Sequence, residues 1–331
     1  MSAKDSMAKE YFADNARFAD LCNNILYGGR EVILPENLKE RDTTEVLTAL
    51  GLDKKTIAVQ KLRDIFKNAS IKYTGKSYVV LIGVENQSDI HYAIPVKNMF
   101  YDVMAYGNQV KETAKKHRKE KDTATSDEFL SGFTKEDKLI PVITITVYLG
   151  TKEWDGPRKL SDMMAFDPED ENLRVLFEEY HLHLFCINEQ NGFDTFHSGL
   201  KQLFCAMNCR KDKERMAELM KNEAYSHLSK ETWEAIAVMT DNAAMLQKKD
   251  KYKTENGKEE EYNMCQALEE LMEEREIMGE RRGRREGRNE GRREGRNEGT
   301  LEKTKTVVQN MLDRGYEIED ICALAGCEAP F

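Results

Sequence analysis

The sequence predicts a mixed α/β domain, followed by a helical region and a charged, repetitive tail. Residues 11–29 have the apolar spacing of an amphipathic helix. Residues 57–90 contain two β-rich runs around a glycine-containing turn, which is a hairpin signal. A second helical segment and an apolar strand at residues 139–150 follow. The predicted order within residues 10–190 is therefore helix, hairpin, helix, strand.

The first predicted helix stops at Gly28-Gly29, a common helix C-terminal signal. Residues 31–53 are predicted as a loop and a short helix. In the hairpin, the run from Tyr78 to Val84 is almost continuously apolar, which is typical of a central strand buried on both faces. The next helix begins near Pro95, where a first-turn proline is tolerated, and ends in a basic stretch near residues 111–123.

Composition limits the class of protein. The 331 residues are 40% hydrophobic and 33% charged, with a net charge of −10. No apolar run approaches the roughly 18 to 20 residues of a membrane span, and the N-terminus lacks the apolar core of a signal peptide, so we expect a cytoplasmic protein without membrane contact. The seven cysteines form no CxxC pair, which favours free thiols over a zinc site.

The C-terminal part divides into three predicted segments. Residues 191–275 are predicted to be helical. Residues 276–300 contain GRREGRNE twice in succession, with glycine at every fourth position. Because interspersed Glu cancels much of the Arg charge, we favour a solvated, partly helical linker or homo-oligomerisation arm over a nucleic-acid-binding tract. Residues 301–331 suggest two short helices around Gly315.

A candidate site lies in the predicted hairpin. Asp64 falls on its first strand, and Glu85 and Gln87 end its second strand. Antiparallel pairing can place residues about 21 apart side by side, and alternation puts Glu85 and Gln87 on one face. Two carboxylates form a hard oxygen site for Mg²⁺ or Mn²⁺, which can activate water towards a phosphodiester. The alternative is a chance pair, although a carboxylate ending a buried strand usually has a partner or a metal.

Three longer runs resemble a known family. KLRDIFK, VLIGVENQSDIHYAIPVKNMFYDVMAY and LIPVITITVYLGTKEWDGP are similar to the recombination-promoting nuclease and transposase family, whose nuclease domain belongs to the PD-(D/E)XK superfamily. Asp64, Glu85 and Gln87 match its Asp and E-x-Q positions. Lys97 and Tyr101 match its helix positions, although Arg is more usual than Lys there. The resemblance covers residues 10–190.

The resemblance implies a PD-(D/E)XK core of helix, three strands, helix and strand, and a DNA endonuclease that needs a divalent cation. Asp64 and Glu85 would hold Mg²⁺ or Mn²⁺, and Gln87 stands where the superfamily usually has Lys. Asp20 on the first helix is a candidate additional acid, with a solvated or capping acid as its alternative. Two other functions stay open: a catalytically inactive DNA- or protein-binding module, and a scaffold that assembles through its tail.

Overall fold

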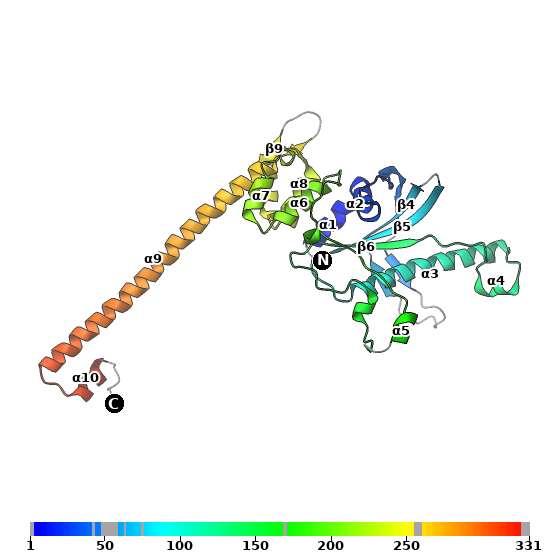
Figure 1. The fold of residues 1–331 in the computed structure, drawn as a ribbon. Helices are drawn as coiled ribbons and strands as arrows, with labels where there is room; N and C mark the ends of the chain where they lie inside the picture. The colour runs from blue at the N-terminus through cyan, green and yellow to red at the C-terminus, as the bar shows by residue number, and fades with distance from the viewer. Residues whose placement is uncertain are drawn as a thin grey trace. The chain divides into compact units, whose positions relative to one another are not determined.

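The computed structural model describes residues 3–41, 44–47, 59–62, 64–73, 76–167, 171–254 and 260–325. A five-stranded mixed sheet with the order β1-β4-β5-β6-β7 lies at its centre. Helices α1 and α2 lie on one side of this sheet and α3 on the other (Figure 1). The predicted mixed α/β class is confirmed. The strands are β1 (Leu38–Glu40), β4 (Ile65–Tyr73), β5 (Lys76–Gln87), β6 (Val142–Tyr148) and β7 (His183–Cys186).

Strands β4 and β5 form the predicted hairpin. They pair antiparallel from Ile65 opposite Val84 to Tyr73 opposite Lys76, and the predicted turn at residues 74–75 lies outside the described residues. β5 then pairs in parallel with β6, and β6 with β7. A parallel pair needs a crossover connection, which α3 (Ile94–Glu120) supplies between β5 and β6.

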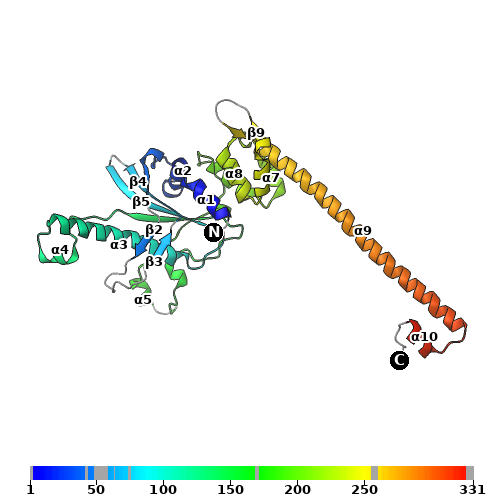
Figure 2. The same cartoon turned by 180° about the vertical axis from the view of Figure 1, so that it is seen from behind.

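The strand predicted from residue 57 is shorter than expected. β4 starts at Ile65, and Val59–Leu62 form β3, which pairs with β2 (Thr44–Leu47) in a separate two-stranded sheet. Figure 2 shows these two strands beside α3. Residues 31–53 contain the 3-10 helix Pro35–Asn37, then β1 and β2. The part of the loop-and-helix prediction on residues 48–53 lies outside the described residues.

The first predicted helix is two helices, α1 (Ala3–Ala13) and α2 (Asn15–Tyr27). Asp14 separates them, because its carboxylate accepts the backbone N–H groups of Ala16 and Arg17 at 3.1 Å and so caps the start of α2. The predicted stop is confirmed: Gly28 has φ 61°, a left-handed conformation that glycine adopts without strain.

Polar side chains fix α3 against β6. Asn98 donates to Thr146 Oγ1 at 2.8 Å, and the Thr144 hydroxyl donates to Asp102 Oδ1 at 2.6 Å; all four side chains are buried. Buried polar groups are costly when unpaired, so these pairs specify one position of the helix along the strand. The first turn of α3 is thereby held over the end of β5.

The far end of α3 is tied to the following loop by His117. Its ring nitrogens lie 2.6 Å from Asp122 Oδ1 and 2.9 Å from Asp137 Oδ2. The hydrogen bond to Asp122, and then that to Asp137, raises the pKa of His117 above its ordinary value. The loop therefore gains stability from a protonated imidazole.

We expect the contribution of His117 to decline as pH rises. A raised folded-state pKa stabilises fully below the unfolded value of about 6.5 and is lost as pH passes the folded value. The melting-temperature difference between wild type and His117→Gln should therefore be largest below about pH 6.5. NMR titration of the ring should give a midpoint above 6.5 that Asp137→Asn lowers. A wild-type midpoint at or below 6.5 contradicts this expectation.

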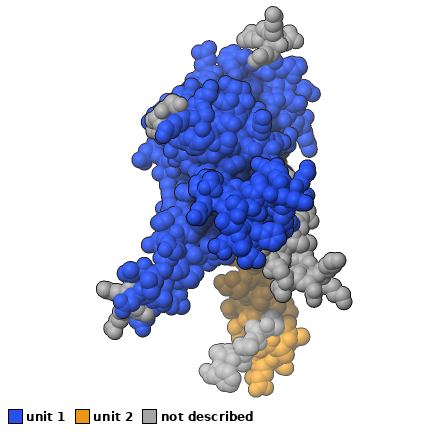
Figure 3. Space-filling model, turned by 90° about the vertical axis from the view of Figure 1, so that its right-hand side faces the viewer, with its two compact units in different colours: residues 1–265 blue, residues 266–331 orange. Residues whose placement is uncertain are grey.

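Residues 191–265 pack with the sheet domain within one compact unit, residues 1–265 (Figure 3). An aromatic cluster joins them, with ring centroids 5.2–6.2 Å apart: Phe12, Phe185, Phe193, Phe196 and Phe204. The remaining elements of this unit are α4 (Ser126–Ser131), α5 (Glu171–Leu176), α6 (Leu200–Cys209), α7 (Lys213–Leu219), α8 (Lys230–Met239), β8 (Leu228–Ser229), β9 (Lys253–Thr254) and β10 (Glu261–Tyr262).

Residues 266–331 form the second unit. The glycine-spaced repeat lies within one continuous helix, α9 (Met264–Asp313), whose 50 residues correspond to about 75 Å. A turn at Gly315, with φ 77°, leads to α10 (Ile318–Ala325). A role of this helix in homo-oligomerisation stays a prediction. None of the described helices is both long and apolar enough to cross a membrane. Five cysteines of the first unit are free thiols: Cys22, Cys186, Cys205, Cys209 and Cys265.

Candidate functional site

Asp64 and Glu85 meet where β4 begins and β5 ends. Asp64 directly precedes Ile65, which pairs with Val84, so the hairpin register carries Asp64 to the position opposite Glu85. The backbone N–H of Asn86 donates to Asp64 Oδ2 at 2.8 Å. The two carboxylates that the sequence singled out, 21 positions apart, are thus brought together by the hairpin.

Glu85 is almost fully buried, with 2% of its surface exposed. Its Oε2 accepts a hydrogen bond from Lys97 Nζ at 2.8 Å, whereas its Oε1 has no hydrogen-bond partner among the described residues. Burial raises the pKa of Glu85, the Lys97 ammonium opposes that rise, and the charge of Asp64 adds to it. A buried carboxylate oxygen without a donor is costly unless a cation meets it.

Asp64 faces the first helix. Burial raises its pKa, while the Asn86 N–H and the ammonium groups of Lys97 and Lys9 lower it; the carboxylate of Asp5 raises it. Asp5 is held in place by the Ser88 hydroxyl, which donates to it at 2.7 Å. Asp5 and Lys9 belong to α1 and were not predicted as site residues, because they precede the segment whose apolar spacing identified a helix.

A cavity of about 400 Å³ opens beside Asp64. It is bounded by α1, the end of β1 and the start of β4, and its lining residues are Ser6, Lys9, Glu10, Ala13, Glu40, Arg41, Asp64, Ile65, Phe66 and Lys67. The cavity gives Asp64 a solvent-filled side, whereas Glu85 is enclosed by the sheet and α3. A ligand of Asp64 could therefore enter from the α1 side.

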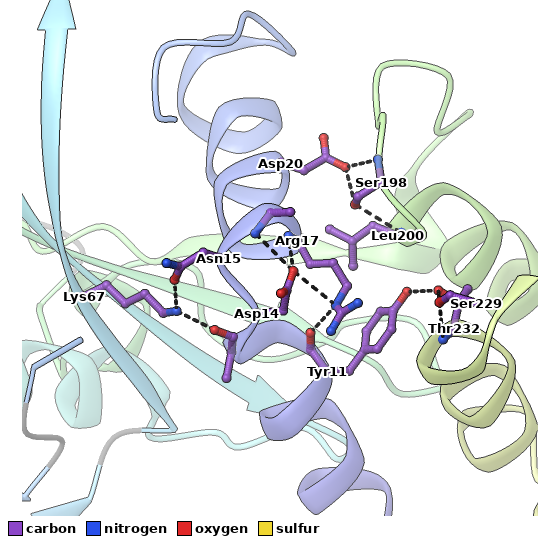
Figure 4. A network of polar contacts seen from close by, with 12 residues as sticks. Tyr11, Asp14, Asn15, Arg17, Asp20, Lys67, Ser198, Leu200, Ser229 and Thr232 are labelled. Carbon is purple, nitrogen blue, oxygen red and sulfur yellow. Dashed lines mark hydrogen bonds and ion pairs between the residues drawn. The ribbon is translucent and has the colours of Figure 1, made fainter. Parts of the chain in front are cut away.

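The junction of α1 and α2 is anchored beneath this cavity by Lys67. Its ammonium donates to Asn15 Oδ1 at 2.5 Å and to the Ala13 carbonyl (Figure 4). The side chain is 1% exposed, and burial lowers its pKa. Glu40 Oε1 lies 3.9 Å from the ammonium and opposes that shift. This anchor holds α1, and with it Asp5 and Lys9, at the edge of the site.

Lys97 supplies the ammonium group that Gln87 does not. Gln87 lies two residues beyond Glu85 on the same face of β5, half-buried and opposite Tyr148. Lys97 reaches Glu85 from the first turn of α3, and its Nζ lies 5.7 Å from the ring centroid of the buried Tyr101. The sequence-predicted Lys97 and Tyr101 are therefore both at the site, and the cation beside Glu85 comes from a helix rather than from the strand.

Asp20 lies elsewhere. Its carboxylate on α2 accepts the Ser198 N–H at 2.8 Å and the Ser198 hydroxyl at 2.6 Å (Figure 4). It also accepts the His197 N–H at 3.1 Å. These bonds secure the loop before α6, and no contact within the described part of the chain joins Asp20 to Asp64 or Glu85. The acidic residue of α1 whose charge acts on Asp64 is Asp5.

The donor set fits a hard divalent cation. Mg²⁺ is commonly held by one or two carboxylates, with water and substrate phosphate as its remaining ligands. Asp64 and Glu85 supply two carboxylates, one of which has an unpartnered buried oxygen. In the described ranges no group of three or more His, Cys, Asp or Glu side chains is placed to hold a metal, so further ligands from the chain would be amide or backbone oxygens, such as those of Gln87.

Comparison with family models, with curated proteins and with solved structures found no match for this chain. The geometry around Asp64 and Glu85 is therefore the main indication of what this protein does.

Proposed function

We propose that this protein is a divalent-metal-dependent DNA endonuclease with a PD-(D/E)XK-like site. The observation that carries the proposal is the Asp64–Glu85 pair, where the hairpin brings the half-buried Asp64 beside the buried Glu85 and leaves Glu85 Oε1 without a donor among the described residues. Natural structures rarely retain such an arrangement without a ligand or a catalytic use.

Asp64 and Glu85 would hold Mg²⁺ or Mn²⁺, and the bound ion would polarise the phosphodiester and lower the pKa of a bound water. Lys97 favours the ionised form of Glu85, because its ammonium opposes the rise in pKa that burial causes. The Asn86 N–H holds Asp64 in a fixed orientation. Gln87, on the face of Glu85, can orient water or a phosphate oxygen through its amide, and Tyr101 packs beneath Lys97.

Cleavage of supercoiled plasmid tests this function. We expect the full chain to cut with Mg²⁺ or Mn²⁺ and not with chelator. Asp64→Ala and Glu85→Ala should each reduce cleavage by roughly 10³-fold, because a metal contributes several kcal/mol of transition-state stabilisation. Glu214→Ala, which removes an exposed carboxylate on α7, should cut like wild type.

A folded wild-type chain that does not cut, or that cuts equally well after either substitution, would exclude this function. The protein would then be a binding module that retains the fold without the chemistry. The same assay resolved by product, nicked circle against linear DNA, would show whether one or both strands are cut.

A further inference from the structure

The C-terminal half of α3 carries a dense set of basic side chains. Residues 111–121 contain six Lys or Arg residues and two acidic ones, Glu112 and Glu120. The whole chain, in contrast, has a net charge of −10. The positive charge is therefore local and concentrated on about three turns of one helix.

Four of these cations project into solvent without a protein partner. Lys115, Lys116, Arg118 and Lys119 are exposed, and none of them forms an ion pair within the described residues. On the other side of these turns, Ala114 and His117 are buried against residues 122–137. We call the four exposed residues the basic arm.

The packing of α3 keeps the basic arm pointing outwards. Asp122 and Asp137 of the following loop both bind His117 on the opposite face. In that loop, Glu128 is engaged in the capping box of α4 through the backbone of residues 124 and 125. Asp122, Asp137 and Glu128 thus have other partners and form no ion pair with the arm in the described part of the chain.

The basic arm and the candidate site share one rigid helix. Lys97 lies in the first turn of α3 and Lys119 in its last, so 22 residues separate them. At 1.5 Å per residue this is about 33 Å, close to the roughly 34 Å of one turn of B-DNA. A duplex whose scissile phosphate lies at the accessible side of the site, beside Asp64, can therefore present phosphates to the arm about one helical turn away.

We propose that the basic arm binds the phosphate backbone of duplex DNA about one helical turn from the Asp64–Glu85 site. The proposal rests on the proposed nuclease function for its choice of DNA. It also explains how an acidic protein holds a polyanion: exposed Lys and Arg neutralise phosphates and release their counterions, whereas the rest of the surface contributes repulsion.

The test measures binding separately from cleavage. Full-length protein is titrated into a labelled 30-base-pair duplex in the presence of chelator, and anisotropy is followed between 50 and 200 mM salt. Replacing Lys115, Lys116, Arg118 and Lys119 with Gln should weaken binding at least tenfold and flatten the slope of log K against log salt by about 3 to 4, since each phosphate contact contributes about 0.9.

The matched control removes the same charge from another exposed surface, by changing Lys211, Lys213, Arg215 and Lys221 near α7 to Gln. It should retain the wild-type slope to within about 1. Circular dichroism and thermal melting confirm that both variants are folded.

An unchanged slope in the arm variant, or an equal loss in the control, overturns the proposal. So does wild-type binding to polyglutamate as tight as to DNA, which would make the arm a protein-docking surface. Because chelator prevents cleavage, the two assays are independent. The arm can be shown to bind DNA even if the plasmid assay shows no nuclease, and cleavage can be shown even if the arm does not bind DNA.

Discussion

Glu85→Gln is expected to stabilise the metal-free protein and to remove its response to Mg²⁺ and Mn²⁺. Burial raises the pKa of Glu85, so the folded state disfavours the ionised carboxylate. The contribution of Glu85 to the stability of the protein is therefore greatest at low pH and is lost as pH rises through the folded-state pKa of Glu85. A neutral amide of the same shape avoids this cost at pH 7. For a domain of this size, each 1 kcal/mol gained raises the melting temperature by roughly 2–4 °C.

Bound metal, in contrast, should raise the melting temperature of the wild-type protein and not that of the variants. An ion that binds only the folded state stabilises it by about 2.7 kcal/mol at 100 times its dissociation constant. Wild type should therefore melt several degrees higher in saturating Mg²⁺ or Mn²⁺, and Glu85→Gln and Asp64→Asn should not. Asp64→Asn should also melt higher than wild type without metal, since burial raises the pKa of Asp64 as well.

Differential scanning fluorimetry at pH 5 to 8, with chelator and with each metal, measures both effects. Glu214→Gln on the exposed face of α7 is the control and should follow wild type throughout. A Glu85→Gln protein that melts lower than wild type in chelator would mean that the pair with Lys97 outweighs the burial cost. A metal response that survives both substitutions would remove Asp64 and Glu85 as ligands.

Phe204→Ala is expected to lower the free energy of unfolding of the whole unit 1–265 by about 3–5 kcal/mol, the usual cost of emptying a buried aromatic site. Phe204 on α6 is fully buried, and its ring packs on Phe12 of α1 and Phe185 of β7. The substitution therefore removes contacts between the sheet domain and the helices after residue 190, and both should lose stability together.

The two tryptophans allow this prediction to be checked on each side of the contact. Trp154 follows β6, and Trp233 lies on α8. Urea unfolding of Trp154→Phe and Trp233→Phe proteins, each with and without Phe204→Ala, reports the two regions separately. Coincident transitions that shift equally support one cooperative unit. A shift seen only by Trp233 would support a domain boundary near residue 190, as the order of predicted elements indicates.

The sequence predicted those features that depend on a few neighbouring residues. The apolar run Tyr78–Val84 identified the central strand, and the pattern around it identified the hairpin. Once the hairpin is given, its register brings Asp64 to Glu85, so this part of the site needed no tertiary information. The helix end at Gly28 and the helix start near Pro95 could also be predicted, because each depends on the conformational limits of one residue type.

Other features depended on contacts between distant segments. Asp20 and Asp5 are both acids near the N-terminus, and only the packing of α1 and α2 decides that Asp5 acts on Asp64 while Asp20 binds Ser198. Asp14 divided a segment whose apolar spacing looked continuous. The packing of Phe204 on Phe185 and Phe196 joins segments on both sides of residue 190, and no local pattern records these contacts.

By itself, then, the sequence determined the hairpin, the mixed α/β class and the pair Asp64 and Glu85, because strand alternation and turn chemistry act over a few residues. Only the tertiary structure decided which cation lies beside Glu85. Gln87, on the same face as Glu85, is a neutral amide, and Lys97 reaches Glu85 from α3 because buried bonds to β6 fix that helix over the site. The position of the Lys97 ammonium beside Glu85 depends on how α3 packs on the sheet, and the local spacing of residues does not encode that packing.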